Sequence, residues 1–211
     1  MSGALQAVFQ NLRSFGPPSV GSAYEGGFFA GQISTSGNGI ANFNLVVGPV
    51  ASAQSSLKFK TSNTGGDPTS VIDGPTNSAT MNSATYPAAQ FCEGLTIGGF
   101  SDWYLPAKNE LEVCYYNLKP GTTSNNTSSG TNTNAVPSRG SNYTAGTPAQ
   151  TSATDFKTTG SEDFDVVNYW SSSQAPTVSN AWRQNFDYGY QGGNADKDNI
   201  VNVRAVRRVA V

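Results

Sequence analysis

The feature of this sequence that most restricts its fold is the shortness of its apolar runs. Hydrophobic residues occur in groups of a few, separated by Gly, Pro, Ser, Thr and Asn, which favour turns and irregular backbone. Such runs are typical of strands joined by loops, and none has the length that a transmembrane helix needs. We therefore expect a loop-rich domain without membrane insertion. Its strands are expected in residues 24–60, 166–172, 181–187 and 200–209.

Two segments have helical spacing instead. Residues 77–95 predict a helix in two parts, interrupted near Pro87. A second helix is expected to open at Pro106, where a missing N–H costs nothing, and to end at residues 119–121. Its apolar stripe comprises Leu111, Cys114, Tyr115 and Leu118. Strands and helices together predict an α+β domain.

The charge composition argues against several classes of function. Only 12% of the 211 residues are charged and the net charge is −2, so the basic surface of a nucleic-acid-binding protein is missing. The sequence contains no histidine, which removes imidazole-based triads and His-ligated zinc. The densest carboxylates, Glu162, Asp163 and Asp165, lie in a polar linker where solvated charge is expected. We expect a protein that is not an enzyme and has no cofactor or metal.

The N-terminal residues predict an attachment segment. Leu5, Val8, Phe9 and Leu12 fall at helical spacing, and the Gly-Pro-Pro run at 16–18 ends the helix. A helix this short is marginal alone, so its apolar stripe is expected to dock either on its own domain or on another subunit.

The composition shifts along the chain suggest three parts. They are an attachment segment at 1–20, a β-rich lead-in at 21–69 with a hairpin turn at 37–39, and a main domain at 70–211. Within the main domain, residues 121–160 have few hydrophobic side chains and predict a polar insertion, solvated or with a role of its own, whose order stays open. No secretion signal is visible, so we expect folding in the cytoplasm. Cys92 and Cys114 are expected as reduced, partly buried thiols, although pairing stays possible if their helices touch.

Four motifs follow one another in the second half of the chain. They are GGFSDWYLP with a following NEL at 98–111, NYWSSS at 168–173, AW with Phe186 at 181–186, and VRAVRRV at 203–209. In this order and spacing they resemble the Lcl C-terminal-like family, which is similar to the C-type-lectin-like domains of formylglycine-generating enzymes and of phage tropism determinants. The resemblance covers about residues 70–211. It implies a C-type-lectin-like fold with two helices packed on a small antiparallel sheet.

The resemblance also bears on location and activity. The YEGGFFAG run at 24–31 is similar to the lead-in of phage-encoded members, which implies a place on a virion. Formylglycine-generating relatives use cysteines for their oxidation chemistry, whereas both cysteines here lie in the helical region. That activity is therefore not carried over to this chain.

The loop at residues 188–199 is the expected recognition surface. Tyrosine gives contact area at little entropy cost, and Asn, Asp and Gln give adaptable hydrogen bonds, although a merely soluble loop is the alternative. Trp103 and Trp170 are expected in the core. For Trp182 two alternatives stay open, a place in the core or contact with a ligand. The candidate ligand-binding residues are Trp182, Gln184, Tyr188, Tyr190, Gln191, Asn194, Asp196, Lys197 and Asn199.

Other charged residues near the C-terminus predict no ligand. Asn194, Asp196 and Asp198 imitate the start of a calcium loop, but Asn199 stands where that loop needs Gly and Ala205 where it needs Glu. The arginines of the last strand are expected to bond to backbone or carboxylates within the domain, or to face an adjacent subunit. These arginines are Arg204, Arg207 and Arg208.

Together these features predict an exterior phage virion protein, a tail fibre or fibre tip, that recognises a host-surface glycan or protein without catalysis. It would be assembled in the host cytoplasm and would contact other virion proteins through its N-terminal segment, as a homotrimer whose repetition strengthens weak sites. A capsid or tail decoration protein with a purely structural role is the first alternative. A polysaccharide-degrading enzyme, which needs two carboxylates in a cleft, is the second.

Overall fold

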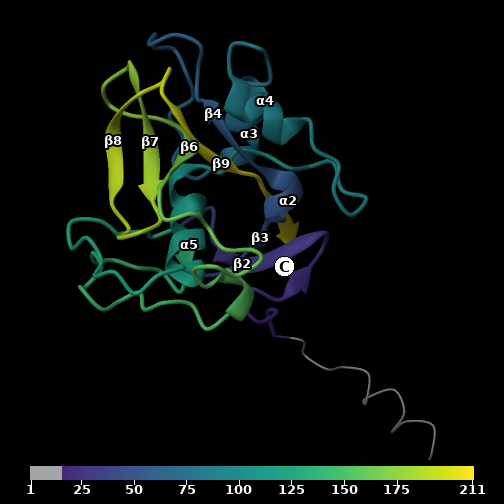
Figure 1. Ribbon diagram of the computed structural model, residues 1–211, viewed down its shortest axis with the longest axis vertical. Coiled ribbons are helices and arrows are strands. Elements are labelled where there is room, and N and C mark those ends of the chain that lie inside the picture. The colour runs from purple at the N-terminus through teal and green to yellow at the C-terminus, as the bar shows by residue number, and fades with distance from the viewer. Residues whose placement is uncertain (1–15) are drawn as a thin grey trace, which may run out of the picture.

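The computed structural model describes residues 16–211, which form two five-stranded sheets with helices packed against them (Figure 1). The first sheet contains Ala23–Tyr24 (β1), Gly27–Ile33 (β2), Phe43–Val47 (β3), Ala135–Val136 (β5) and Val206–Ala210 (β10). Its order is β1-β2-β3-β10, with β5 paired to β2. The second contains Gln54–Lys58 (β4), Asn168–Gln174 (β6), Asn180–Asn185 (β7), Gln191–Asp196 (β8) and Ile200–Arg204 (β9), in the order β4-β9-β6-β7-β8.

The helices confirm the two helical segments and shift one boundary. They are Val50–Ala53 (α2), Gly74–Thr80 (α3), Pro87–Glu93 (α4) and Lys108–Leu118 (α5), with a 3-10 turn, η1, at Thr154–Phe156. The predicted break falls between α3 and α4, and Pro87 opens α4. The expectation that Pro106 opens the next helix is wrong, because α5 begins at Lys108. The Ala107 N–H there donates to Glu110 Oε2 (2.8 Å) and closes the first turn.

The α+β class is confirmed, but the expectation of one small antiparallel sheet is wrong. The lead-in strands extend the sheets: β3 pairs along its length with β10, and β4 with β9. In addition, β6 and β9 pair in parallel at Tyr169 and Asn202. A division of the chain at residue 70 therefore does not separate the hydrogen-bonded sheets. The predicted attachment residues Leu5, Val8, Phe9 and Leu12 lie outside the described residues.

Two clusters of buried side chains hold these layers together. The first surrounds α5, whose Leu111, Cys114, Tyr115 and Leu118 are buried as the stripe predicts, and α5 packs on β2, β6 and β7. The second contains Trp103 and Trp170, 1% and 0% exposed, which confirms their core role. Cys92 and Cys114 are free, as expected. Each is fully buried, and burial raises the pKa of both thiols.

The polar insertion at 121–160 is not the solvated excursion that loop composition favoured. It lies along α5, below that helix in the view of Figure 1, and buries Ala135, Tyr143 and Phe156 in the first cluster. Its backbone is held by specific contacts, including Asn125 N–H to Ala145 O and Tyr143 N–H to Ser129 O. Such contacts satisfy backbone groups that a sheet or helix would otherwise pair.

The arginines of the last strands bond within the domain, as expected, whereas Glu162 is not solvated as expected. Arg204 donates to Gly48 O and to Glu162, and Arg207 to Asp102, so both bond within the domain. Arg208 bonds to buried Glu110 and to the carbonyl of Ile72. Glu162, expected to be solvated, pairs with a buried guanidinium instead. None of the helices in the described part of the chain has the length and apolar character that a membrane crossing requires.

Four buried tyrosines predict how stability depends on alkaline pH. Burial raises the pKa of Tyr169 to about 12, and it also raises the pKa of Tyr104, Tyr115 and Tyr143. The folded pKa values of these tyrosines exceed the unfolded value of about 10. The stability that comes from burying their neutral hydroxyls is therefore complete below pH 10 and is lost as pH rises toward 12. We expect the free energy of unfolding, measured by urea titration, to fall over that interval. A constant value there would contradict the burial of these phenols.

Candidate functional site

Half of the expected recognition loop at 188–199 is a strand. Residues 191–196 form β8, which pairs with β7 at the edge of the second sheet, with Gln191 opposite Gln184 and Asp196 opposite Asn180. The expectation of a long loop projecting between two strands is therefore wrong. Gly and Asn suggested a loop, but two glycines fit a strand whose Gly193 lies against the Trp182 ring. The surface that remains is the β7–β8 hairpin with its tight turn at 186–190.

The hairpin turn presents two stacked tyrosines. The rings of Tyr188 and Tyr190 lie 6.4 Å apart at 15°, and Tyr188 is 37% exposed. Asn185 Oδ1 accepts the N–H groups of Asp187 and Tyr188, which fixes the turn. Two rings held in this way offer a rigid apolar surface that loses little entropy on binding.

A cation from α5 lies beside an indole of the hairpin. Lys108, the first residue of α5, places its ammonium 4.8 Å from the centre of the Trp182 ring, and Trp182 is half-buried. Burial lowers the pKa of Lys108, and the charge of Glu112 opposes that shift. Trp182 is therefore neither a core residue nor a freely exposed one. Part of its ring is available to a ligand.

Two adjoining hollows lie along the segment 121–160, and the first of them separates the segment from the hairpin. The first, about 170 Å³, lies between Lys108, Trp182 and Gln191 on one side and residues 128–131 on the other. The second, about 310 Å³, lies between Tyr116 and residues 138–144 with Thr147, and Asn142 lines both. Among the residues that the structure describes, no Asp or Glu lines either hollow. Their walls carry hydroxyl, amide, cationic and aromatic groups.

Buried Glu112 fixes the segment that forms half of these walls. Its carboxylate accepts hydrogen bonds from Tyr143 Oη (2.6 Å), Asn132 Nδ2 (2.6 Å) and Arg139. The Arg139 guanidinium in turn lies 4.0 Å from the centre of the Tyr116 ring. A carboxylate with no exposed surface and three donors is a fully satisfied anchor.

Further bonds join the segment directly to the hairpin. Asn126 N–H donates to Tyr188 O (2.7 Å), and Gln191 N–H donates to Ser129 Oγ (3.0 Å). Nearby, Thr123 Oγ1 donates to Asp187 (2.7 Å). The hairpin and the segment are thus one surface, which we call the hairpin surface: residues 108, 116, 126–131, 138–147 and 182–191.

Comparison with known proteins identifies the family to which this architecture belongs. A model of the Lcl C-terminal domain matches residues 54–207. The chain belongs to the Lcl C-terminal domain family. The match covers three of the four motifs and residues 203–207 of the fourth, and it begins before residue 70, so this Lcl C-terminal domain includes β4. It confirms the resemblance drawn from those motifs.

Other comparisons add little. A search of curated proteins finds no match to this Lcl C-terminal domain. A fimbrial protein from Bacteroides ovatus, known from a crystal structure, is similar with a TM-score of 0.41 and 13% identity. The alignment covers 95% of this chain and 41% of the fimbrial protein, so the chain spans about two fifths of its length.

The structure separates the nine sequence-predicted ligand residues into three groups. Trp182, Tyr188, Tyr190 and Gln191 lie together on the hairpin surface. Two predictions are wrong about exposure: Gln184 is 1% exposed and Lys197 is 0% exposed, and Lys197 pairs with Asp67 in the interior. The other three are exposed along or after β8, away from the hollows. They are Asn194, Asp196 and Asn199.

Sequence reasoning missed several residues of the hairpin surface. Lys108, Tyr116, Arg139 and Asn142 come from α5 and the polar segment, far from the hairpin in the sequence. No local pattern marks them, because their proximity to Trp182 depends on how residues 121–160 pack along α5. The one available signal is the segment itself, too long for an ordinary connection.

A glycine in the hairpin turn tests this geometry. Gly189 has a φ of +76°, and a Cβ there would lie 2.5 Å from the Tyr115 ring. We expect Gly189→Ala to lower the free energy of unfolding by about 1–3 kcal/mol, because strain and overlap add. Gly146→Ala is the matched control, since nothing lies within 4 Å of its Cβ position. Equal stabilities of the two variants in urea titrations would contradict the described turn.

Proposed function

We propose that this Lcl C-terminal domain belongs to an exterior phage virion protein, a tail fibre or fibre tip with a C-type-lectin-like fold, that binds a host-surface glycan or protein. Binding takes place at the hairpin surface and is non-covalent. The observation that carries the proposal is the pair Trp182 and Lys108 lining one polar hollow, with the stacked Tyr188 and Tyr190 in the turn of the same hairpin as Trp182. Rigid aromatic rings with surrounding amides and hydroxyls are typical of recognition surfaces.

Family membership supports the class of protein. The Lcl C-terminal domain is of a tail-fibre or tropism type, and the 24–31 run resembles the lead-in of phage-encoded members. A fold alone does not fix a function, so the ligand has to be argued from the surface. The shallow hollows favour a partner held by several weak contacts rather than one deeply enclosed molecule.

The chemistry of the hairpin surface supports binding without catalysis. A glycosidase needs two carboxylates facing one cleft, and the described hollows of this surface are lined by none. The buried carboxylates of the domain have structural partners: Glu110 bonds to Tyr104 and Arg208, and Glu112 to the polar segment. Burial raises the pKa of Glu110, and Arg208 donates a hydrogen bond to its carboxylate.

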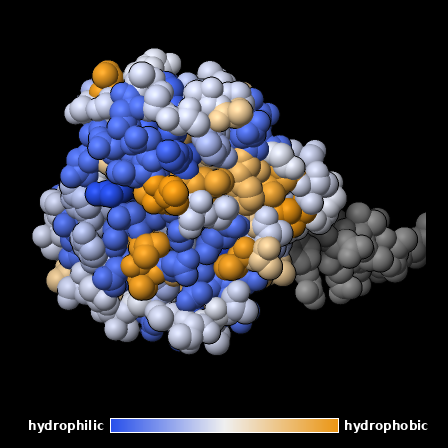
Figure 2. All heavy atoms as spheres, turned by 45° about the horizontal axis from the view of Figure 1, so that its top comes forward, coloured by the Kyte–Doolittle hydropathy of each residue, from blue (hydrophilic) through white to orange (hydrophobic). Residues whose placement is uncertain are grey.

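The assembly belongs to the same proposal. The N-terminal residues attach the domain to other virion proteins, and three copies present the hairpin surface on the virion exterior after assembly in the host cytoplasm. Repetition of a weak site raises its avidity. Figure 2 shows a face on which hydrophilic residues cover much of the surface and a band of apolar residues crosses the middle.

The test is saturation binding of fluorescently labelled protein to intact cells of candidate hosts, with unlabelled protein as competitor. We expect saturable binding to at least one host that excess unlabelled protein abolishes. The decoration alternative predicts that folded protein binds no candidate host and that the hairpin surface is covered by a neighbouring virion protein. The second result would replace the proposal with that alternative.

A further inference from the structure

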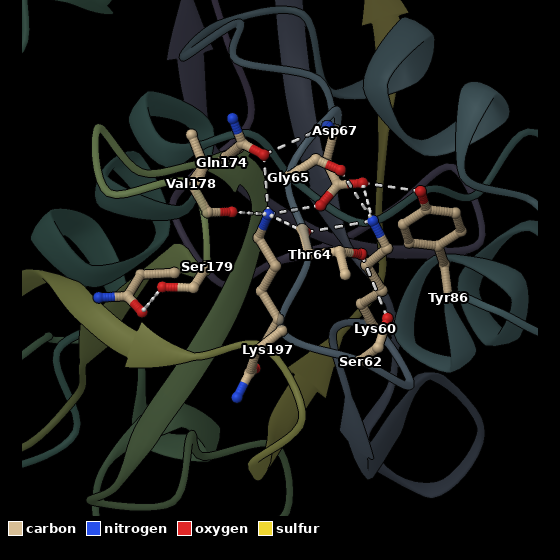
Figure 3. A network of polar contacts seen from close by, with 12 residues as sticks. Lys60, Ser62, Thr64, Gly65, Asp67, Tyr86, Gln174, Val178, Ser179 and Lys197 are labelled. Carbon is tan, nitrogen blue, oxygen red and sulfur yellow. Dashed lines mark hydrogen bonds and ion pairs between the residues drawn. The ribbon is translucent and has the colours of Figure 1, made fainter.

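A buried cluster at one end of the second sheet has the form of a cation site (Figure 3). The ammonium of Lys197, whose side chain has no exposed surface, lies among four oxygens. These are Asp67 Oδ2 at 2.5 Å, Val178 O at 2.6 Å, Gln174 Oε1 at 2.8 Å and Thr64 O at 3.1 Å. An ammonium has three protons, so the shell holds more oxygens than it can donate to separately.

The oxygens come from segments that no strand pairing joins at this point. Thr64 and Asp67 lie after β4, Gln174 and Val178 lie at the end of β6 and in the following turn, and Lys197 follows β8. Without a positive charge these oxygens, which surround the buried Lys197, would repel one another. The cation therefore balances these oxygens, while backbone hydrogen bonds such as Gln174 N–H to Pro68 O (2.8 Å) and Lys197 N–H to Ser179 O (3.3 Å) also join the three segments.

The neighbouring Lys60 has one oxygen partner fewer than Lys197. Lys60 Nζ contacts three oxygens, Asp67 Oδ1 at 2.8 Å, Gly65 O at 3.1 Å and Thr64 O at 3.2 Å, which matches its three protons. Burial acts to raise the pKa of Asp67, but hydrogen bonds from Lys197 and Lys60 leave it lowered, so the carboxylate is charged. One carboxylate thus balances one of two ammonium groups.

We propose that Lys197 is a tethered cation occupying a monovalent-cation site, which takes potassium or ammonium when the lysine side chain is removed. Carbonyl, amide and carboxylate oxygens are ligands of such ions. The separations to Gln174 and Thr64, 2.8 Å and 3.1 Å, exceed the roughly 2.3–2.6 Å that calcium requires, whereas those to Asp67 and Val178 lie within that range. The charge argues for a monovalent ion, because Lys60 would repel calcium's second charge.

The attached cation makes the form of this end of the sheet independent of the salts in solution. Because its cation is covalently attached, the end of the sheet keeps its form without a bound ion, and no change in salt composition can empty the site. This inference is independent of the proposed recognition function, since none of its residues lies on the hairpin surface.

The experiment compares melting temperatures in chlorides of potassium, ammonium and choline at equal ionic strength. We expect Lys197→Ala to melt about 6–15 °C below the wild type in choline, and to recover about 2–5 °C, saturably, in potassium or ammonium. Lys197→Met, whose apolar side chain fills the space, should show no recovery. Lys60→Ala, which leaves the four-oxygen shell occupied, should show none either.

Two results would overturn the inference. One is a Lys197→Ala variant whose melting temperature is the same in all three salts. The other is a wild type that potassium itself stabilises over choline, because its shell would then not be filled. If Lys197→Ala does not fold in choline, refolding yield in ammonium and in choline replaces the melting temperature, with the same criterion.

Discussion

Replacing Glu112 by Ala should detach the polar segment from α5 and destabilise the domain by about 3–5 kcal/mol, the range for breaking a buried ion pair. The change leaves the Tyr143 hydroxyl, the Asn132 amide and the Arg139 guanidinium without their shared acceptor. We expect limited proteolysis to cut within 121–160, and urea titration to show the loss of stability. Because that segment forms half of the hollows, binding to host cells should also fall.

The control for Glu112 is an exposed acidic residue of the same chain. Asp196→Ala removes a carboxylate whose side chain is exposed, so we expect stability to change by no more than about 0.5 kcal/mol. A Glu112→Ala protein as stable and as protease-resistant as Asp196→Ala would show that the carboxylate does not anchor the segment.

Replacing Trp182 by Ala should weaken binding to host cells about 10- to 100-fold, because a half-buried indole beside a cation is typical of a binding hot spot. Trp182→Phe should retain most of the affinity, since a smaller ring still covers the hollow. Circular dichroism and melting curves of both variants separate a loss of ligand contact from a loss of folding. Affinity unchanged in a folded Trp182→Ala protein would remove the indole from the site.

The sequence predicts the parts of this fold that depend on local periodicity. The stripe of Leu111, Cys114, Tyr115 and Leu118 marks α5 correctly, and Pro87 marks the break between α3 and α4. The burial of Trp103 and Trp170 also follows from their apolar surroundings. The order of the four motifs leads to the family itself.

The sequence does not reveal what depends on distant contacts. The Gly-rich run that becomes β8 is a strand because β7 pairs with it, not because of its own propensity. Lys197 looks like an exposed loop residue until Asp67, 130 positions earlier, is placed beside it. In the same way, the polar segment has too few apolar residues to predict packing. It is held by Asn and Glu side chains buried among hydrogen bonds.

The central claim is that the hairpin surface recognises the host, and the stacked tyrosines test it most directly. Saturation binding to a host that binds the wild type is compared for Tyr188→Ala/Tyr190→Ala and for Val211→Ala, which truncates an exposed residue at the C-terminus. We expect the double variant to lose at least about tenfold in affinity, or about 1.4 kcal/mol, with Val211→Ala unchanged. A folded double variant that binds as tightly as the wild type would contradict recognition through this surface.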